Sequence, residues 1–154
     1  VVDWLNSLVP FDTETAFPKR IFVTRNDSSV RKLLNLDEIE PLLLKRGFEP
    51  VTLSGRSVIE QTSLFHQAEA IVGVHGAALA NLAFTRPGTK MIEMLPKNHL
   101  EPSYWFIGQQ RQLDYTLLLG QEKPLSVARW RRNMMADLSI DPAALTASLD
   151  EKGL

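Results

Sequence analysis

The sequence predicts an α/β domain built on an open, mostly parallel sheet flanked by helices. From Lys19 onward, short β-rich runs alternate with helical patterns at a spacing typical of right-handed strand–helix–strand units. Residues 70–74 are apolar throughout, which is typical of a strand buried on both faces of a parallel sheet. With 154 residues, the chain has the length of one such domain.

Five strands are predicted, at residues 20–24, 49–53, 70–74, 90–94 and 114–118. Residues 1–19 contain Pro10 and Pro18 and show no clean period. We therefore expect a lead-in segment over residues 1–19 and a Rossmann-like domain over residues 20–154.

Capping signals place the first two helices. Asn35 and Glu38 have the spacing of a capping box, and that helix is expected to end before Gly47. Ser57 and Glu60 form a second capping box, which opens a helix between the second and third strands.

Two further helices follow from the sequence. One is expected to begin just after His75-Gly76 and to run to about Phe84. The other is C-terminal: Asp141-Pro142 supplies an N-cap and a first-turn proline, and the helix is expected to end near Leu149.

Composition excludes several classes of protein. Apolar residues make up 44% of the chain and charged residues 23%, as in a folded globular protein. Lys and Arg number 17 against 18 Asp and Glu, so no basic field indicates a nucleic-acid partner. The chain has no cysteine, no signal peptide and no apolar run of the roughly 18 residues needed to span a membrane.

We therefore expect a cytoplasmic setting. Because the first residue is Val and not Met, the chain is also expected to be a piece of a longer protein. Any membrane attachment would then lie in parts absent from this chain.

Common cofactor and nucleotide motifs are absent. The third strand leads into Gly73-Val74-His75-Gly76, not G-x-G-x-x-G, which disfavours NAD and FAD, and there is no Walker-type loop. The three histidines lack ligand spacing, and no Asp-x-Asp pair offers a metal clamp, so no metal site is expected. Gly55-Arg56-Ser57 resembles a nucleophile elbow without its second glycine, a weak indication of a hydrolase.

Ligands of open parallel sheets bind outside the carboxyl ends of the strands. Arg25, Asn26 and Asp27 follow the first strand, with Arg31 and Asn35 close behind; His75, Gly76 and Ala77 follow the third strand, and Glu93 lies on the fourth. Two arginines, a histidine and a helix start at one sheet edge suit an anion that carries a flat ring.

Each of these residues also has a purely structural interpretation. The arginines could be solvated loop charges, His75 a hydrogen-bonded residue at a helix start, and Gly76 a turn residue. Asn81 could be a paired polar residue and Glu60 only a capping residue. Trp130, between Arg129 and Arg131, could stack on a base, although an amphipathic surface connector is the simpler interpretation.

The order of these residues resembles a known family. Arg25 and Arg31 are followed by Asn35-x-x-Glu38, Gly47-Phe48, Glu60-Gln61 and Phe65-x-x-Ala68, then by Ile71-Val72-Gly73-Val74-His75-Gly76-Ala77-Ala78-Leu79-x-Asn81 and Gly88-x-x-Met91-Ile92-Glu93. Over about residues 20–118 this ordered set is similar to glycosyltransferase family 61.

The resemblance implies an inverting, metal-independent enzyme that transfers a sugar from a nucleotide sugar, usually a UDP-sugar, to a saccharide or protein acceptor. Synthesis of capsular or surface polysaccharide is one such role. It also implies a GT-B enzyme of two Rossmann-like halves. This chain would be the donor-binding half and inactive alone, because the N-terminal half of the same protein is missing. The alternative is a non-catalytic module with the same fold and an anion pocket.

The resemblance also assigns roles to residues. It puts Arg25 and Arg31 near the diphosphate and His75-Gly76-Ala77 at the phosphate-facing helix start, with His75 stabilising the leaving group. Glu60 is a second catalytic candidate, and the other expected substrate-binding residues are Asn35, Gln61, Asn81 and Glu93.

Two positions depart from the family pattern. Ala78 stands where glycine is frequent, and Leu36 stands where an acidic residue is common. Both are expected to shift donor preference without abolishing binding.

Overall fold

The structure is a computed structural model that describes residues 2–25, 28–98, 101–122 and 136–154. Asn26, Asp27 and the Trp130 segment, which the sequence offered as candidate site positions, lie outside the described residues.

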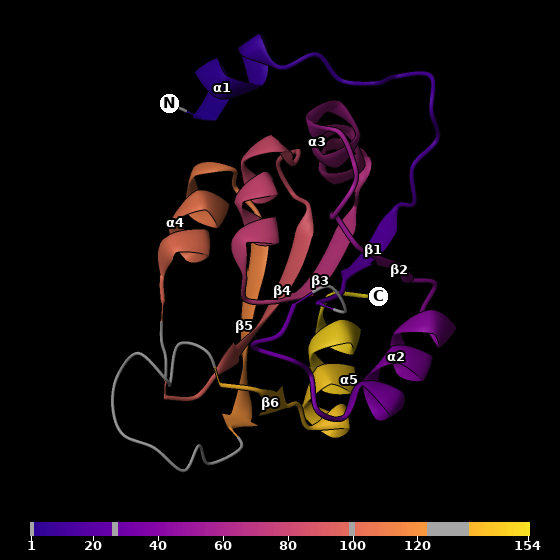
Figure 1. The fold of residues 1–154 in the computed structure, drawn as a ribbon, viewed down its shortest axis with the longest axis vertical. Helices are drawn as coiled ribbons and strands as arrows, with labels where there is room; N and C mark the ends of the chain where they lie inside the picture. The colour runs from indigo at the N-terminus through magenta and orange to yellow at the C-terminus, as the bar shows by residue number, and fades with distance from the viewer. Residues whose placement is uncertain (1, 26–27, 99–100, 123–135) are drawn as a thin grey trace.

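Six strands form one sheet in the order β2-β1-β3-β4-β5-β6 (Figure 1). They are β1 Arg20–Val23, β2 Glu49–Val51, β3 Ala70–Val74, β4 Lys90–Pro96, β5 Asp114–Glu122 and β6 Leu138–Ser139. The first five pair in parallel, whereas β6 pairs with β5 in antiparallel fashion. The predicted mostly parallel α/β sheet is therefore confirmed.

Helices cover both faces of the sheet. Helices α2 (Leu36–Lys45) and α5 (Pro142–Glu151) lie together on one face. On the other lie α3 (Val58–Gln67), the 3₁₀ helix η1 (Ala77–Phe84) and α4 (Ser103–Gln110) (Figure 1). Alternate residues of each central strand supply the two cores, so Phe22 and Val72 face α2 and α5 while Ile21 and Ile71 face α3 and η1.

The predicted bounds of the strands and helices agree closely with those in the structure where the sequence has a strong apolar or capping pattern. Strand β3 has the predicted bounds, β4 and β5 extend beyond theirs, and β1 and β2 end one or two residues earlier. The Ser57–Glu60 capping box is present, and Asp141 caps α5 by accepting a hydrogen bond from the Ala143 N–H at 3.0 Å.

One predicted cap is wrong. Asn35 precedes α2, but its side chain makes no capping hydrogen bond. Its amide pairs instead with the backbone of Ile140, donating to the carbonyl at 2.8 Å and accepting from the N–H at 3.1 Å. Tertiary hydrogen bonds to a segment 105 residues away have replaced the local cap.

The lead-in segment packs against the domain. It contains a short helix, α1 (Val2–Leu8), and Asn6 donates to the carbonyl of Ala83 at 2.7 Å. Further along, the Phe11 ring stacks on His66 with centroids 4.1 Å apart. Residues of the lead-in therefore cover part of the layer formed by α3 and η1.

Strand order places the ligand-binding edge. After β1 the chain adds β2 on one side and then crosses to add β3 on the other, so β1 and β3 are neighbours whose connections diverge. Open parallel sheets bind ligands at such a reversal, beside the carboxyl ends of the two strands. None of the helices in the described residues is long and apolar enough to cross a membrane.

Candidate donor-binding cleft

A cleft of about 590 Å³ opens at the carboxyl ends of β1 and β3, a volume within the range of small-molecule sites. Its lining comes from the ends of β1, β2 and β3, the loop after β1, and helices α3 and η1: Val23, Thr24, Arg25, Ser28, Ser29, Arg31, Leu53, Ser54, Gly55, Gln61, Val74, Ala77, Ala78 and Asn81. These described residues include two arginines and no carboxylate. Although the whole chain has a net charge of −1, the charged side chains in the described part of the cleft lining are both arginines.

Arg25 lies between its own loop and the end of β3. Its Nη2 donates to Ser28 Oγ at 2.7 Å and its Nε to the Val30 carbonyl at 3.2 Å. Its Nη1 lies 3.5 Å from the carbonyl oxygen of His75. The guanidinium group therefore joins the two strand ends, as the sequence predicted when it placed Arg25 and His75 at one edge.

Arg31 is held in a costly conformation. Its φ of 55° is in the left-handed region, which side chains other than glycine rarely adopt. Its Nε is buried and has no hydrogen-bond partner among the described residues. Buried donors are paired in the great majority of cases, so this guanidinium N–H at the cleft is an exception to the rule.

Gly76 is explained by Arg25 and not by a turn. Its φ of 173° is extended backbone that any residue adopts. A Cβ atom at this position, however, would lie 1.7 Å from Arg25 Nη1. Glycine is therefore needed for the close approach of the guanidinium group to the backbone at the end of β3.

His75 belongs to a buried polar chain beside the cleft. Its side chain is 6% exposed, and its Nδ1 lies 2.6 Å from Oε1 of Glu93. The other oxygen of Glu93 accepts a hydrogen bond from the Tyr115 hydroxyl. The His75 ring also contacts Tyr104, with centroids 4.9 Å apart.

Burial raises the pKa of both tyrosines, and the Glu93 carboxylate raises them further. For Tyr104, Arg31 and Arg25 act in the opposite direction, so this ring lies within electrostatic reach of both arginines.

The 3₁₀ winding of η1 explains how one short helix serves both core and cleft. Side chains three residues apart eclipse in a 3₁₀ helix. Leu79 and Leu82 accordingly form a buried row, while Ala78 and Asn81 line the cleft. Asn81 donates to Gln61 Oε1 at 3.4 Å, and Gln61 donates to the Arg56 carbonyl at 3.0 Å, which ties η1 to the loop after β2.

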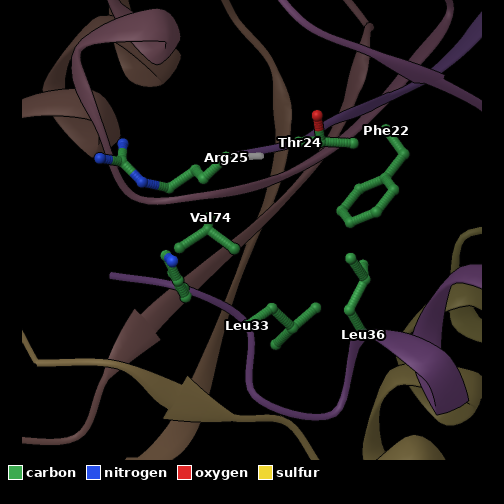
Figure 2. A pocket seen from close by; sticks show the side chains of 7 residues that line it. Phe22, Thr24, Arg25, Leu33, Leu36 and Val74 are labelled. Atoms are coloured by element: carbon green, nitrogen blue, oxygen red, sulfur yellow. The ribbon is translucent and has the colours of Figure 1, made fainter. Parts of the chain in front are cut away.

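A second, smaller cavity of about 340 Å³ adjoins the cleft and shares with it Thr24, Arg25 and Val74. Its remaining walls are Phe22, Lys32, Leu33 and Leu36. Figure 2 shows the Phe22 ring and the Leu36 side chain facing each other across the space, while Arg25 extends away from both. Ala78 and Leu36, the two departures from the family pattern, therefore line the cleft and the smaller cavity respectively.

Five predicted site residues are not among those that line the cleft: His75, Gly76, Asn35, Glu93 and Glu60. His75 and Gly76 lie beside it at the end of β3, between the lining residues Val74 and Ala77. Asn35 is engaged with Ile140, as described above. Glu93 is 1% exposed and bonds His75 and Tyr115. Glu60 is exposed, and hydrogen bonds from the Ser57 backbone N–H and then the Ser57 hydroxyl lower its pKa. Their roles toward a substrate stay predictions.

The Ser57 hydroxyl is itself used in this cap, because it donates to Glu60 at 2.8 Å and accepts from the Glu60 N–H at 3.2 Å. The hydrolase interpretation required a Ser57 away from any helix cap, so that alternative is wrong.

Sequence reasoning missed several residues of the site. Ser54 and Gly55 follow β2, and the carboxyl-end rule applied to that strand would have found them. Tyr104 lies on α4, whose contiguous apolar run Tyr104–Ile107 has no helical period. Nothing in the sequence pattern distinguished Tyr115 from a core aromatic residue.

Among the described residues, no group of three histidine or carboxylate side chains lies close enough to hold a metal ion. The fold and the cleft thus define an α/β domain with a cleft whose described lining contains two arginines and no carboxylate.

Comparison with known proteins assigns the domain to a family. The sequence profile described as Glycosyltransferase 61 matches residues 5–92. A beta-1,2-xylosyltransferase of rice, Oryza sativa subsp. japonica, is 29% identical over 139 residues, covering 84% of this chain and 23% of the relative. The profile matches more than half of the chain, so the chain belongs to glycosyltransferase family 61. The chain spans less than a quarter of the length of the rice relative.

Proposed function

We propose that this chain is the donor-binding domain of an inverting glycosyltransferase. The cleft would hold a nucleotide sugar, of the UDP-sugar class, with its diphosphate between Arg25 and Arg31. The observation that carries this proposal is the buried, unpaired Nε of Arg31 in a cleft lined by two arginines and no carboxylate among the described residues. The domain would form one half of a two-domain GT-B enzyme, in which the other half brings the acceptor.

The charge of the cleft matches the chemistry of the leaving group. When the bond from the sugar to the diphosphate breaks, negative charge develops on the diphosphate oxygens. Preorganised cationic donors aimed at that charge stabilise the transition state, and arginine can grip phosphate oxygens in a bidentate manner. Because Arg25 and Arg31 supply this charge, we propose that transfer is metal-independent, so a chelator should leave donor affinity unchanged.

The smaller cavity suits the flat ring of the nucleotide. Phe22, Leu33, Leu36 and Val74 give it mainly apolar walls, and Arg25 connects it to the cleft. A nucleotide diphosphate likewise has an apolar flat ring at one end and an anionic group at the other. We therefore place the base in the smaller cavity and the diphosphate in the cleft.

Calorimetric titration tests the proposal. Two charge-assisted contacts contribute about 3–6 kcal/mol, before the cost of ordering the ligand. A millimolar ligand corresponds to about 4 kcal/mol. We expect UDP to bind with an affinity near the millimolar end, Arg31→Ala to weaken binding several-fold, and the chain alone to show no transfer. Absence of UDP binding, or an unchanged affinity in Arg31→Ala, would refute the donor site.

A second titration separates the two cavities, with uridine and inorganic pyrophosphate as probes. Leu36→Trp fills the smaller cavity, so it should weaken the binding of uridine and of UDP but not the binding of pyrophosphate. Arg31→Ala should weaken the binding of pyrophosphate and of UDP but not the binding of uridine. Leu34→Trp is the matched control, because Leu34 is 44% exposed and does not line the cavity. If each variant lost affinity for uridine and for pyrophosphate to the same extent, the base and the diphosphate would not occupy separate subsites.

A further inference from the structure

A third pocket, of about 240 Å³, lies over the middle of β4 and β5, beside the start of helix α4. Alternate residues of the two strands form its floor. Glu93 pairs in register with Leu117, and Leu95 and Tyr115, two residues away from them, point to the same face. The pocket is smaller than the roughly 300–1,000 Å³ of sites for drug-sized ligands, so it has room for a single small ring. No described residue lines both this pocket and the donor cleft.

Trp105 on α4 forms one wall of the pocket. It remains 45% exposed, although an indole ring has one of the largest apolar surfaces of any side chain. The Phe106 ring meets it edge-on, with centroids 5.1 Å apart and an angle of 66° between the planes. Leu117 on the floor is also exposed. Exposed apolar side chains gathered around one concave place are typical of binding sites.

Two carboxyl groups interrupt this apolar lining. Glu93 on the floor is buried, whereas Glu101, just before α4, is half-buried. The Ser103 N–H donates to Oε1 of Glu101 at 3.1 Å, and the Ser103 hydroxyl donates to the same oxygen. A carboxyl oxygen has two lone pairs and accepts hydrogen bonds from hydroxyl groups. The pocket therefore offers an aromatic surface next to an acceptor of hydroxyl protons.

This combination selects the chemistry of the ligand. A pyranose ring presents C–H groups on a face, which pack against an aromatic ring, and hydroxyl groups around its edge, which donate to a carboxyl group. A purely apolar side chain of another protein would cover the carboxyl groups without hydrogen-bonding them, and burial of a polar group without a new partner is costly.

One row of side chains joins the pocket to the donor cleft. His75, Glu93 and Tyr115 form a diagonal across β3, β4 and β5, which begins beside the cleft and ends in the pocket. Tyr104 contacts His75, with ring centroids 4.9 Å apart. Burial raises the pKa of Tyr104, both arginines of the cleft lower it, and both carboxyl groups of the pocket raise it. Tyr104 is therefore within electrostatic reach of both sites.

We propose that this pocket binds a pyranose ring, stacked on Trp105 and hydrogen-bonded to Glu101. The inference deepens the proposed function and rests on it for the role of the ring, which belongs either to the sugar of the donor or to a saccharide acceptor. Binding of the ring itself does not depend on the donor site.

NMR of the indole Nε1–H groups tests the proposal on the chain alone, and Trp105→Phe identifies the Trp105 signal by its loss. The probes are the methyl β-glycosides of xylose, glucose, galactose and N-acetylglucosamine, titrated to about 50 mM because a single stacked ring is a weak ligand. At least one glycoside should shift the Trp105 signal saturably. The Trp4 signal should stay in place, since Trp4 is 63% exposed but does not line the pocket. No shift at Trp105, or an equal shift at Trp4, overturns the proposal.

Cyclohexanol distinguishes a sugar site from a merely apolar pocket, because its ring has the same size but carries one hydroxyl group. It should bind several-fold more weakly than the glycoside, and equal affinity overturns the proposal. Followed on the ligand signals, Trp105→Ala should weaken glycoside binding several-fold, and Trp105→Phe, which keeps a ring, should weaken it less. Glu101→Ala should weaken the binding of the glycoside but not that of cyclohexanol. Trp4→Ala is the matched control and should change neither affinity.

The source of the ring is assigned by following the Trp105 signal with UDP and with the UDP-sugar of the glycoside that binds. A shift with the UDP-sugar but not with UDP supports the sugar of the donor. A shift with the free glycoside when the protein is saturated with the UDP-sugar supports an acceptor. If UDP binds and no sugar shifts Trp105, the inference is wrong and the donor site stands. Failure of UDP to bind refutes the proposed function and leaves the glycoside result standing.

Discussion

Arg31 combines three features that lower the stability of the fold. Selection for stability alone would replace such a residue. Its backbone is left-handed, its Nε is buried without a partner among the described residues, and it shares the lining of the cleft with a second arginine, Arg25. Left-handed backbone costs about 1–2 kcal/mol for a residue with a Cβ. Strain of this kind tends to persist at sites that bind ligands.

Replacing Arg31 by glycine should therefore stabilise the protein while it weakens donor binding. Relief of backbone strain and loss of an unsatisfied donor outweigh the roughly 0.5–1 kcal/mol entropic cost of glycine. We expect a net gain of about 1 kcal/mol, or about 2–4 °C in Tm, and a several-fold weaker UDP affinity. Gln112→Gly is the matched control, because Gln112 has the same φ of 55° but lies outside the cleft. A variant that binds UDP as tightly as the wild type would remove Arg31 from the site.

At the scale of elements, local chemistry decided what the sequence could predict. Helix α3 was predictable because Ser57 and Glu60 form a complete capping box that needs nothing else from the fold. Asn35 has the same local pattern, yet its amide bonds Ile140, whose proximity no local rule shows. Helix α4 was missed because its apolar residues are contiguous, and β6 because it has only 2 residues.

The α3 cap makes a pH-dependent contribution to stability. Hydrogen bonds from Ser57 lower the pKa of Glu60 below its ordinary value of about 4.5. A lowered folded-state pKa stabilises the protein above the ordinary value, and this contribution is lost as the pH falls through the folded value. Glu60→Gln should thus lower Tm at pH 7, and the difference from wild type should shrink below about pH 4. Glu151→Gln, an exposed carboxylate in the last turn of α5, serves as the comparison in the same thermal scans. A constant difference at all pH values would show that the charge of Glu60 is irrelevant to the cap.

At the scale of the whole molecule, the sequence predicted the class of fold and the edge where ligands bind, but not the complete site. Fully apolar strands and the carboxyl-end rule sufficed to bring Arg25, Arg31 and Ala77 to one cleft, whereas Gln61 and Asn81 were expected there only from the family resemblance. The diagonal from His75 to Tyr115 depends on strand register, which the periodicity of single strands does not contain. The contacts of residues 136–140 could not be predicted for the same reason, although this segment holds in place the end of the loop that carries Arg31.

That segment forms a brace of four contacts with residues 32–35. The Lys32 N–H donates to Asp137 Oδ1 at 2.8 Å, Leu138 exchanges backbone hydrogen bonds with Lys32 and Leu34, and Ile140 bonds Asn35. Asp137→Ala should cost about 0.5–1.5 kcal/mol, speed amide exchange at Lys32 and weaken UDP binding severalfold. Asp150→Ala provides the comparison, since it removes a surface ion pair with Arg46, which does not line the cleft. It should change neither amide exchange at Lys32 nor the affinity for UDP. Unchanged exchange at Lys32 would show that Asp137 does not support the loop.

The brace has a consequence for how donor preference can change among related enzymes. The family profile ends at residue 92, so residues 137–140 lie outside the segment by which the family is identified. Because residues 137–140 hydrogen-bond the chain at residues 32–35, substitutions there are expected to shift Lys32 and Leu33, which line the smaller cavity, without changing any lining residue. If the cavities hold the donor as proposed, two enzymes with identical lining residues are expected to differ in the nucleotide sugar they accept when only this stretch of chain differs.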